Sequence, residues 1–121
     1  DMIGYLPFTP NLALSEVAHQ NILDYAAEDN IIANERSIAG GDVGDVSCFY
    51  PMIQFGYNGF SGAIHGTDFK IEDTYKAFVE PAKIVCGCVV DLLEKPELIA
   101  QIKASHHSMD KEVYKSYLQG K

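Results

Sequence analysis

Apolar side chains recur at helical spacing in two parts of the chain. The pattern predicts a first helix over about residues 11–27, with Asn11 as the residue that accepts a hydrogen bond from the first turn. It predicts a longer helix over about residues 73–94. Because Pro81 lies inside the second pattern, we expect a kink there or a helix start near Glu80. The predicted apolar stripe of this helix consists of Tyr75, Phe78, Ala82, Val85, Val89, Leu92 and Leu93.

Shorter signals lie between and after these helices. Met52–Phe55 is mainly apolar, follows a proline and precedes a glycine, so we predict a strand, with a second short strand at Ile31–Ala33. Residues 34–41 and 57–67 are predicted to be loops. Asp42, after two glycines, is a candidate cap for a single helical turn.

The C-terminal part is predicted to be helical as well. Pro96 can open a helix with Leu98, Ile99 and Ile102 facing inward, and residues 105–121 are expected to form a frayed or short helix. Two strands are too few for an independent sheet, yet the long apolar stripe needs a sheet to cover it. We therefore predict an α/β fold, with residues 1–121 as a piece of a larger domain.

Composition narrows the classes of function. Of the 121 residues, 47% are hydrophobic, which is ordinary for a packed core, and the net charge of −8 argues against nucleic-acid binding. No signal peptide or membrane-spanning apolar run is visible. The three cysteines, Cys48, Cys86 and Cys88, are expected to be buried, reduced thiols of a cytoplasmic protein. Because the first residue is Asp1, we expect a chain cut or shortened from a longer one.

The candidate chemistry lies between Gly40 and His65. Asp42 and Asp45 stand in a glycine-containing turn before the predicted strand, and His65 stands in the loop after it. Loops that carry aspartate and histidine beside a buried strand are where metal hydrolases place ligands and their supports. One histidine cannot hold a catalytic metal, so the rest of such a site would lie outside these residues.

Several blocks of sequence resemble the C-terminal segment of the aminoacylase/carboxypeptidase-type metal-dependent amidohydrolases, a metallopeptidase family. The resemblance is greatest to the subfamily of aminobenzoyl-glutamate utilization proteins and related dipeptide hydrolases. Asp42–Ser47 resembles the family signature Asp-x-Gly-[Asp/Asn]-Val-Ser, and His65 falls where the family has its last metal-ligating histidine. The blocks cover roughly residues 5–102 and are Tyr5–Ala13, Asp42–Ser47, Ile64–His65 and Ala82–Leu98.

The resemblance implies a mixed sheet flanked by helices, interrupted by a lid domain that mediates dimerisation. It implies two divalent metal ions, zinc or manganese, held mostly by residues upstream of the lid, together with an upstream glutamate as general base. The reaction would be hydrolysis of an amide bond in an N-acyl amino acid, aminobenzoyl-glutamate or a dipeptide by a metal-activated water. In this chain His65 would be a metal ligand, and Asp42 and Asp45 would orient ligands or substrate. The lid and the N-terminal half are absent, so we expect the isolated chain to hold no catalytic residue, to bind no catalytic metal and to be inactive.

Other interpretations of these residues remain open. The family usually has a hydroxyl residue where Gly41 stands, and the loop after His65 is shorter than usual. His65 could be an ordinary surface or hydrogen-bonded histidine, and Asp42 and Asp45 a helix cap and a solvated charge. The His106-His107 pair is interpreted as incidental, and His19 as a residue on the polar face of the first helix or a hydrogen-bonded core histidine. The alternative function is a non-catalytic association module or a degenerate descendant.

Overall fold

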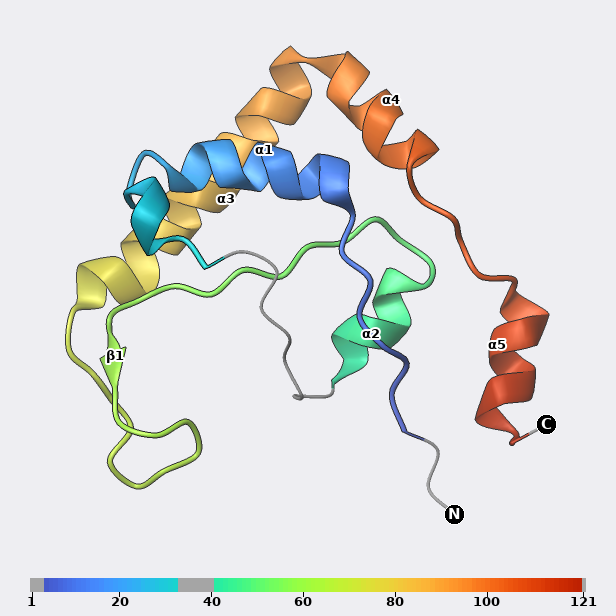
Figure 1. The fold of residues 1–121 in the computed structure, drawn as a ribbon, viewed down its shortest axis with the longest axis horizontal. Coiled ribbons are helices and arrows are strands. Elements are labelled where there is room, and N and C mark those ends of the chain that lie inside the picture. Colours follow the sequence, from blue (N-terminus) through green and yellow to red (C-terminus); the bar gives the residue numbers. More distant parts are fainter. Residues whose placement is uncertain (1–3, 33–40, 121) are drawn as a thin grey trace. The chain divides into compact units, whose positions relative to one another are not determined.

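The computed structural model describes residues 4–32 and 41–120 (Figure 1). This part of the chain is rich in helices and has one small antiparallel sheet of two strands. Among the described residues, no helix combines the length and the apolar character needed to cross a membrane. The elements are α1 (Leu12–Ile22), η1 (Glu28–Asn30), α2 (Asp42–Ser47), β1 (Phe60–Ser61), β2 (Lys70–Ile71), η2 (Tyr75–Val79), α3 (Glu80–Glu94), α4 (Pro96–Ala104) and α5 (Lys111–Leu118).

The chain divides into two compact units, which are described separately below. The first unit comprises Asp1–Ser15, Ile32–Ile53 and Glu97–Lys121, and it contains α2 and α5. The second unit comprises Glu16–Ile31 and Gln54–Pro96, and it contains the β1–β2 hairpin, η2 and α3. α1 begins in the first unit and ends in the second.

Local chemistry sets the helix starts. Asn11 is buried, and its Oδ1 accepts a hydrogen bond from the Leu14 N–H at 2.9 Å, so the predicted cap of α1 is confirmed. α3 begins at Glu80 with Pro81 in its first turn, and Pro96 opens α4, both as predicted. Proline is well tolerated at the start of α4 because first-turn amides have no partner within the helix. α3 instead continues directly from η2, and the Glu80 N–H donates to the Tyr75 carbonyl. α1 ends at Ile22, earlier than the predicted residue 27.

The strand predictions were wrong. Met52–Phe55 is not a strand in the described structure. The Met52 carbonyl accepts a hydrogen bond from the Asn11 N–H at 2.8 Å. Ile31 and Ile32 are not in a strand either, and Ala33 lies outside the described residues. The two strands lie instead inside and just after the predicted 57–67 loop, with Phe60 opposite Ile71 and Ser61 opposite Lys70. An extended apolar segment becomes a strand only where another backbone pairs with it.

The predicted buried face of α3 was also wrong. Val85, Val89 and Leu93 are 51%, 50% and 73% exposed, whereas Ile84 and Cys88 are buried. No sheet covers the predicted stripe in the described structure. α3 is apolar on more than one face, so periodicity alone does not identify the side that packs.

The contact between α1 and α3 explains which face is buried. The Asn21 amide donates to the Val17 carbonyl at 2.9 Å and to Asp91 Oδ2 at 2.8 Å. A Cβ at Gly87 would lie 1.9 Å from Asn21 Oδ1, so the helices approach closely where residue 87 has no side chain. Hydrogen bonds from Lys95 and Asn21 hold the pKa of Asp91 below its usual range. The second unit therefore packs α1 on the Ile84, Gly87 and Cys88 side of α3.

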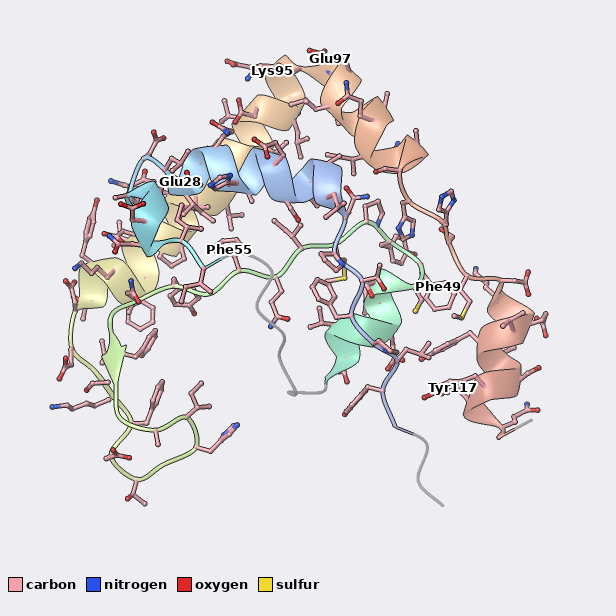
Figure 2. All side chains as sticks on the ribbon, in the orientation of Figure 1. Glu28, Phe49, Phe55, Lys95, Glu97 and Tyr117 are labelled. Atoms are coloured by element: carbon pink, nitrogen blue, oxygen red, sulfur yellow. The ribbon has the colours of Figure 1, made fainter. Side chains whose placement is uncertain are left out.

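The cysteines and the first histidine have distinct surroundings. Cys88 is buried, and burial raises the pKa of its thiol, as expected for an unreactive core cysteine. Cys86 is exposed and Cys48 is half-buried, so the prediction of buried thiols holds only in part. His19 lies on α1 with its Nε2 3.2 Å from Glu28, which is labelled in Figure 2.

Candidate functional site

His65 lies at the tip of the hairpin that joins β1 to β2, on the loop drawn beyond the β1 arrow in Figure 1. The Gly66 N–H donates to the Ala63 carbonyl at 2.7 Å, which makes Ala63–Gly66 a tight turn with Ile64 and His65 at its centre. His65 has a φ of 65°, in the left-handed region that glycine prefers. The side chains of His65 and Ile64 are both exposed. The His65 side chain is therefore exposed, and its backbone has a conformation that costs free energy in a residue other than glycine.

Aromatic packing fixes the base of this hairpin. The Phe60 ring stacks on Phe69 with centroids 5.3 Å apart and meets the Phe78 ring edge-on at 6.4 Å. Such ring pairs contribute about 0.5–1.5 kcal/mol each beyond the area they bury. Phe60 thus joins the two sides of the hairpin and connects them to η2.

Backbone contacts at Gly59 fasten the hairpin further. The Gly59 carbonyl accepts hydrogen bonds from the N–H groups of Glu72 at 2.8 Å and Asp73 at 3.2 Å. With a φ of 103°, Gly59 also approaches η2 so closely that a Cβ would lie 2.5 Å from the Ala77 nitrogen. η2 is a π-helical segment, a type of turn that is often found at functional sites. These contacts therefore fix the start of the hairpin that carries the His65 loop against η2.

The aspartates of the predicted signature lie in the first unit, on α2. Asp45 Oδ1 accepts a hydrogen bond from the Leu6 N–H at 3.1 Å. Ser47 Oγ accepts one from the Thr9 N–H at 3.2 Å and donates to the Gly44 carbonyl at 2.7 Å. Two side chains of α2 thus bind the backbone of the segment that leads into α1.

Gly44 completes this contact by lacking a side chain. A Cβ at this position would lie 1.8 Å from the Leu6 carbonyl oxygen. Such an overlap with backbone could be relieved only by moving α2 away from the N-terminal segment. We call Gly44, Asp45 and Ser47 the α2 clamp.

Asp42 differs from Asp45 in its surroundings. Gly41 is the cap residue of α2, and Asp42 is the exposed first residue of the helix, so the prediction of Asp42 as the cap was wrong. A carboxylate in the first turn interacts favourably with the helix dipole, typically by 0.3–1 kcal/mol. Because its side chain is exposed, Asp42 can contact groups beyond the helix.

Aromatic side chains of α5 pack beside the α2 clamp. Phe49 and Tyr114 meet edge to face with centroids 5.1 Å apart, and the Tyr117 hydroxyl donates to the Gly4 carbonyl. Figure 2 shows Phe49 after α2 and Tyr117 on α5. Burial and the nearby charge of Asp45 raise the pKa of Tyr114.

The predicted site residues occur in different surroundings. Asp42 and Asp45 share α2 in the first unit, whereas His65 belongs to the second unit. Within residues 4–32 and 41–120, no group of three or more His, Cys, Asp or Glu side chains is arranged to hold a metal ion. The described residues therefore do not fit a complete metal centre, and His65 can supply at most one ligand to a shared one.

A hollow in the first unit was not predicted from the sequence. It encloses about 310 Å³ and is lined by Thr9, Pro10, Asn11, Leu12, Ser105, His106 and His107. The Asn11 amide donates to the Ile102 carbonyl at 3.2 Å and to Ser105 Oγ at 3.0 Å, and these bonds account for its buried side chain. His106 Nε2 is buried and has no hydrogen-bond partner in the described structure. Apart from the cap at Asn11, no sequence signal indicated this hollow, because its two sides lie far apart in the chain.

Comparison with protein-family models, with curated protein sequences and with solved structures finds no match to this chain.

Proposed function

We propose that this chain is the C-terminal segment of the catalytic domain of a metal-dependent amidohydrolase. The observation that carries the proposal is the outward-facing His65, held in a left-handed backbone conformation on a braced hairpin. Non-glycine residues in such conformations cost of the order of 1–3 kcal/mol and cluster at functional sites. Glycine would relieve this cost, so the presence of histidine is better explained by the chemistry of its ring.

Imidazole suits the proposed role. A neutral histidine offers one ring nitrogen to zinc or manganese, while its other nitrogen can be fixed by a hydrogen bond. If such a metal were bound, it would supply a water molecule of lowered pKa for amide hydrolysis. The other ligands and the general base would come from residues outside the described chain. The substrate class we propose is a small amide: an N-acyl amino acid, aminobenzoyl-glutamate or a dipeptide.

The two aspartates have different roles in this proposal. Asp45 binds the Leu6 backbone and thereby holds the N-terminal segment in place. Asp42 is exposed and could orient a substrate group or a metal ligand.

The exposed apolar surface of the second unit supports the proposal that the segment belongs to a larger domain. Val85, Val89 and Leu93 are at least half exposed on α3, and Phe78 is 54% exposed on η2. Contiguous apolar surface of this kind usually marks an interaction site. We propose that the remainder of the catalytic domain covers it. A cytoplasmic location, which we also propose, agrees with the free thiols of Cys48, Cys86 and Cys88.

The test uses the complete protein that carries this chain. We expect purified protein loaded with zinc or manganese to hydrolyse N-acyl amino acids or dipeptides. His65→Ala should lower kcat severely without changing thermal stability, because an exposed loop residue contributes little to the core. An unchanged kcat in that variant would refute the role of His65.

The alternative proposal, a non-catalytic association module, is favoured by the same apolar surface of α3. The two proposals differ in what precedes the chain in its reading frame. A His-x-Asp or Cys-x-His ligand motif upstream would favour the enzyme, and a start codon close to Asp1 would favour the module.

A further inference from the structure

Asn58 is followed by Gly59 just before β1, and no other asparagine of the sequence precedes a glycine. The carbon of an asparagine side-chain amide can be attacked by the backbone nitrogen of the next residue, which closes a succinimide ring. A side chain on that next residue hinders the attack, and glycine has none. This pair is therefore the place in the sequence where the reaction meets the least steric resistance.

The structure leaves both reacting groups of the pair free. Asn58 is exposed, Gly59 is half-buried, and neither residue belongs to a helix or a strand. Among the described residues, no group forms a hydrogen bond with the Asn58 side chain or with the Gly59 N–H. Neither group therefore has to give up a contact of the fold before the two react.

The other described asparagines lack at least one of these conditions. Asn11 is buried, and the side-chain amide of Asn21 donates to two acceptors. Asn30 is exposed, but the next residue is the β-branched Ile31, whose N–H donates to the Glu28 carbonyl at 3.0 Å. These three asparagines are internal controls, because they share one molecule and one solution with Asn58.

We infer that Asn58 is a site of spontaneous covalent modification by deamidation. The Gly59 nitrogen gives its proton to hydroxide and bonds to Cγ of Asn58, and the side-chain nitrogen leaves as ammonia after taking a proton from water. Water then adds to one of the carbonyl carbons of the succinimide. Cleavage of the bond between Cγ and the Gly59 nitrogen gives aspartate, whereas cleavage at the main-chain carbonyl carbon gives isoaspartate, in which the chain runs through Cγ. Water is the only co-reactant, and the inference does not depend on the proposed function.

The isoaspartate product would disturb the contacts that Gly59 makes with η2 and the residues before it. The Gly59 carbonyl accepts hydrogen bonds from the N–H groups of Glu72 and Asp73, and a Cβ at Gly59 would lie 2.5 Å from the Ala77 nitrogen. Isoaspartate adds a methylene to the main chain directly before Gly59 and must displace it, whereas aspartate leaves the main chain unchanged. We therefore expect isoaspartate, and not aspartate, to loosen the start of the hairpin.

The first part of the test incubates the folded protein that carries this chain in mildly alkaline buffer at physiological temperature. Peptide mapping by mass spectrometry, with chromatographic separation of the aspartyl and isoaspartyl peptides, follows each asparagine over time. We expect Asn58 to convert to both products while Asn11, Asn21 and Asn30 remain amides. Asn58→Gln is the matched control and should not convert, because its longer side chain would have to close a larger ring. Retention of the Asn58 amide, or conversion no faster than that of Asn30, would overturn the inference.

The second part measures hydrogen exchange at the Glu72 and Asp73 N–H groups in fresh protein, in the separated isoaspartyl fraction and in Asn58→Asp. We expect exchange at least about tenfold faster in the isoaspartyl fraction, which corresponds to the loss of one backbone hydrogen bond. Asn58→Asp, which adds the same charge on an unchanged main chain, should exchange as fresh protein does. Equal exchange in all three would overturn the predicted loosening of the hairpin and leave the modification site standing. Equally fast exchange in Asn58→Asp would overturn the assignment of the loosening to the lengthened main chain.

Discussion

The α2 clamp and the His65 loop use polar residues and glycine in opposite ways. In the clamp, Asp45 and Ser47 bind backbone N–H groups, and the absence of a side chain at Gly44 lets two segments touch. In the loop, Gly62 and Gly66 also allow close contacts, but His65 itself is exposed and held in a left-handed conformation. The clamp residues are explained by the fold, whereas the fold alone gives no reason for histidine at position 65.

This difference distinguishes residues that stabilise the fold from His65, which is proposed to bind a ligand. The segment Asp42–Ser47 contains two aspartates, and the structural role of one of them, Asp45, accounts for its presence. Asp42 and His65, both exposed, are the candidates that the fold does not explain. Substitutions in the two regions should therefore affect stability and ligand binding differently.

The largest effect is expected for Gly44→Ala in the α2 clamp. A methyl group 1.8 Å from the Leu6 carbonyl oxygen must displace backbone, so we expect a loss of about 3 kcal/mol or more in the free energy of unfolding. Urea denaturation measures it. Gly41→Ala is the matched control, because its φ of 178° suits any residue and no atom lies within 4 Å of the added Cβ. If both variants were equally stable, the clamp would not hold α2 in place.

A smaller effect is expected when the Asp45 carboxylate is removed. Asp45→Ala leaves the Leu6 N–H without its acceptor and should cost about 1–2 kcal/mol. Asp42→Ala removes a carboxylate from the same helix and should cost less than about 1 kcal/mol. Comparing the two variants by urea denaturation tests the distinction drawn between these aspartates. A greater loss in Asp42→Ala would reverse it.

The pH dependence of stability should report the proximity of Asp45 to Tyr114 in the first unit. Because the pKa of Tyr114 is raised in the folded state, its contribution to stability is present below the ordinary tyrosine pKa of about 10. That contribution is lost as the pH rises through the folded pKa. Asp45→Asn removes a nearby negative charge, so the pKa of Tyr114 should fall. The difference in phenolate absorption between each protein and its Tyr114→Phe counterpart separates this group from the other six tyrosines. No change in Asp45→Asn would mean that the charge of Asp45 does not contribute to the raised pKa of Tyr114.

Features of the fold with local causes could be predicted from the sequence. The start of α1 at Asn11, the start of α3 near Pro81 and the start of α4 at Pro96 depend on one or two neighbouring residues. The buried face of α3 could not be predicted, because it is decided by Asn21 meeting Gly87, 66 positions apart in the printed sequence. The prediction of a strand at Met52–Phe55 was wrong for a related reason, because a strand forms only where a second segment of backbone pairs with it.

The candidate site could be predicted only in outline. His65 was found as a histidine in a glycine-rich loop, and the structure places it on a hairpin tip. Its positive φ has no counterpart in apolar periodicity. The role of Asp45 also escaped prediction, because its partner, Leu6, lies 39 residues away in sequence.

The most direct test of the central claim is a pair of measurements on His65→Gly. Glycine suits a φ of 65°, so we expect the free energy of unfolding to stay unchanged or to rise by up to about 1 kcal/mol. In the complete protein, the same variant should bind one zinc ion at least tenfold more weakly than wild type. A less stable protein with unchanged zinc affinity would contradict the account, because histidine 65 would then serve the fold rather than a ligand.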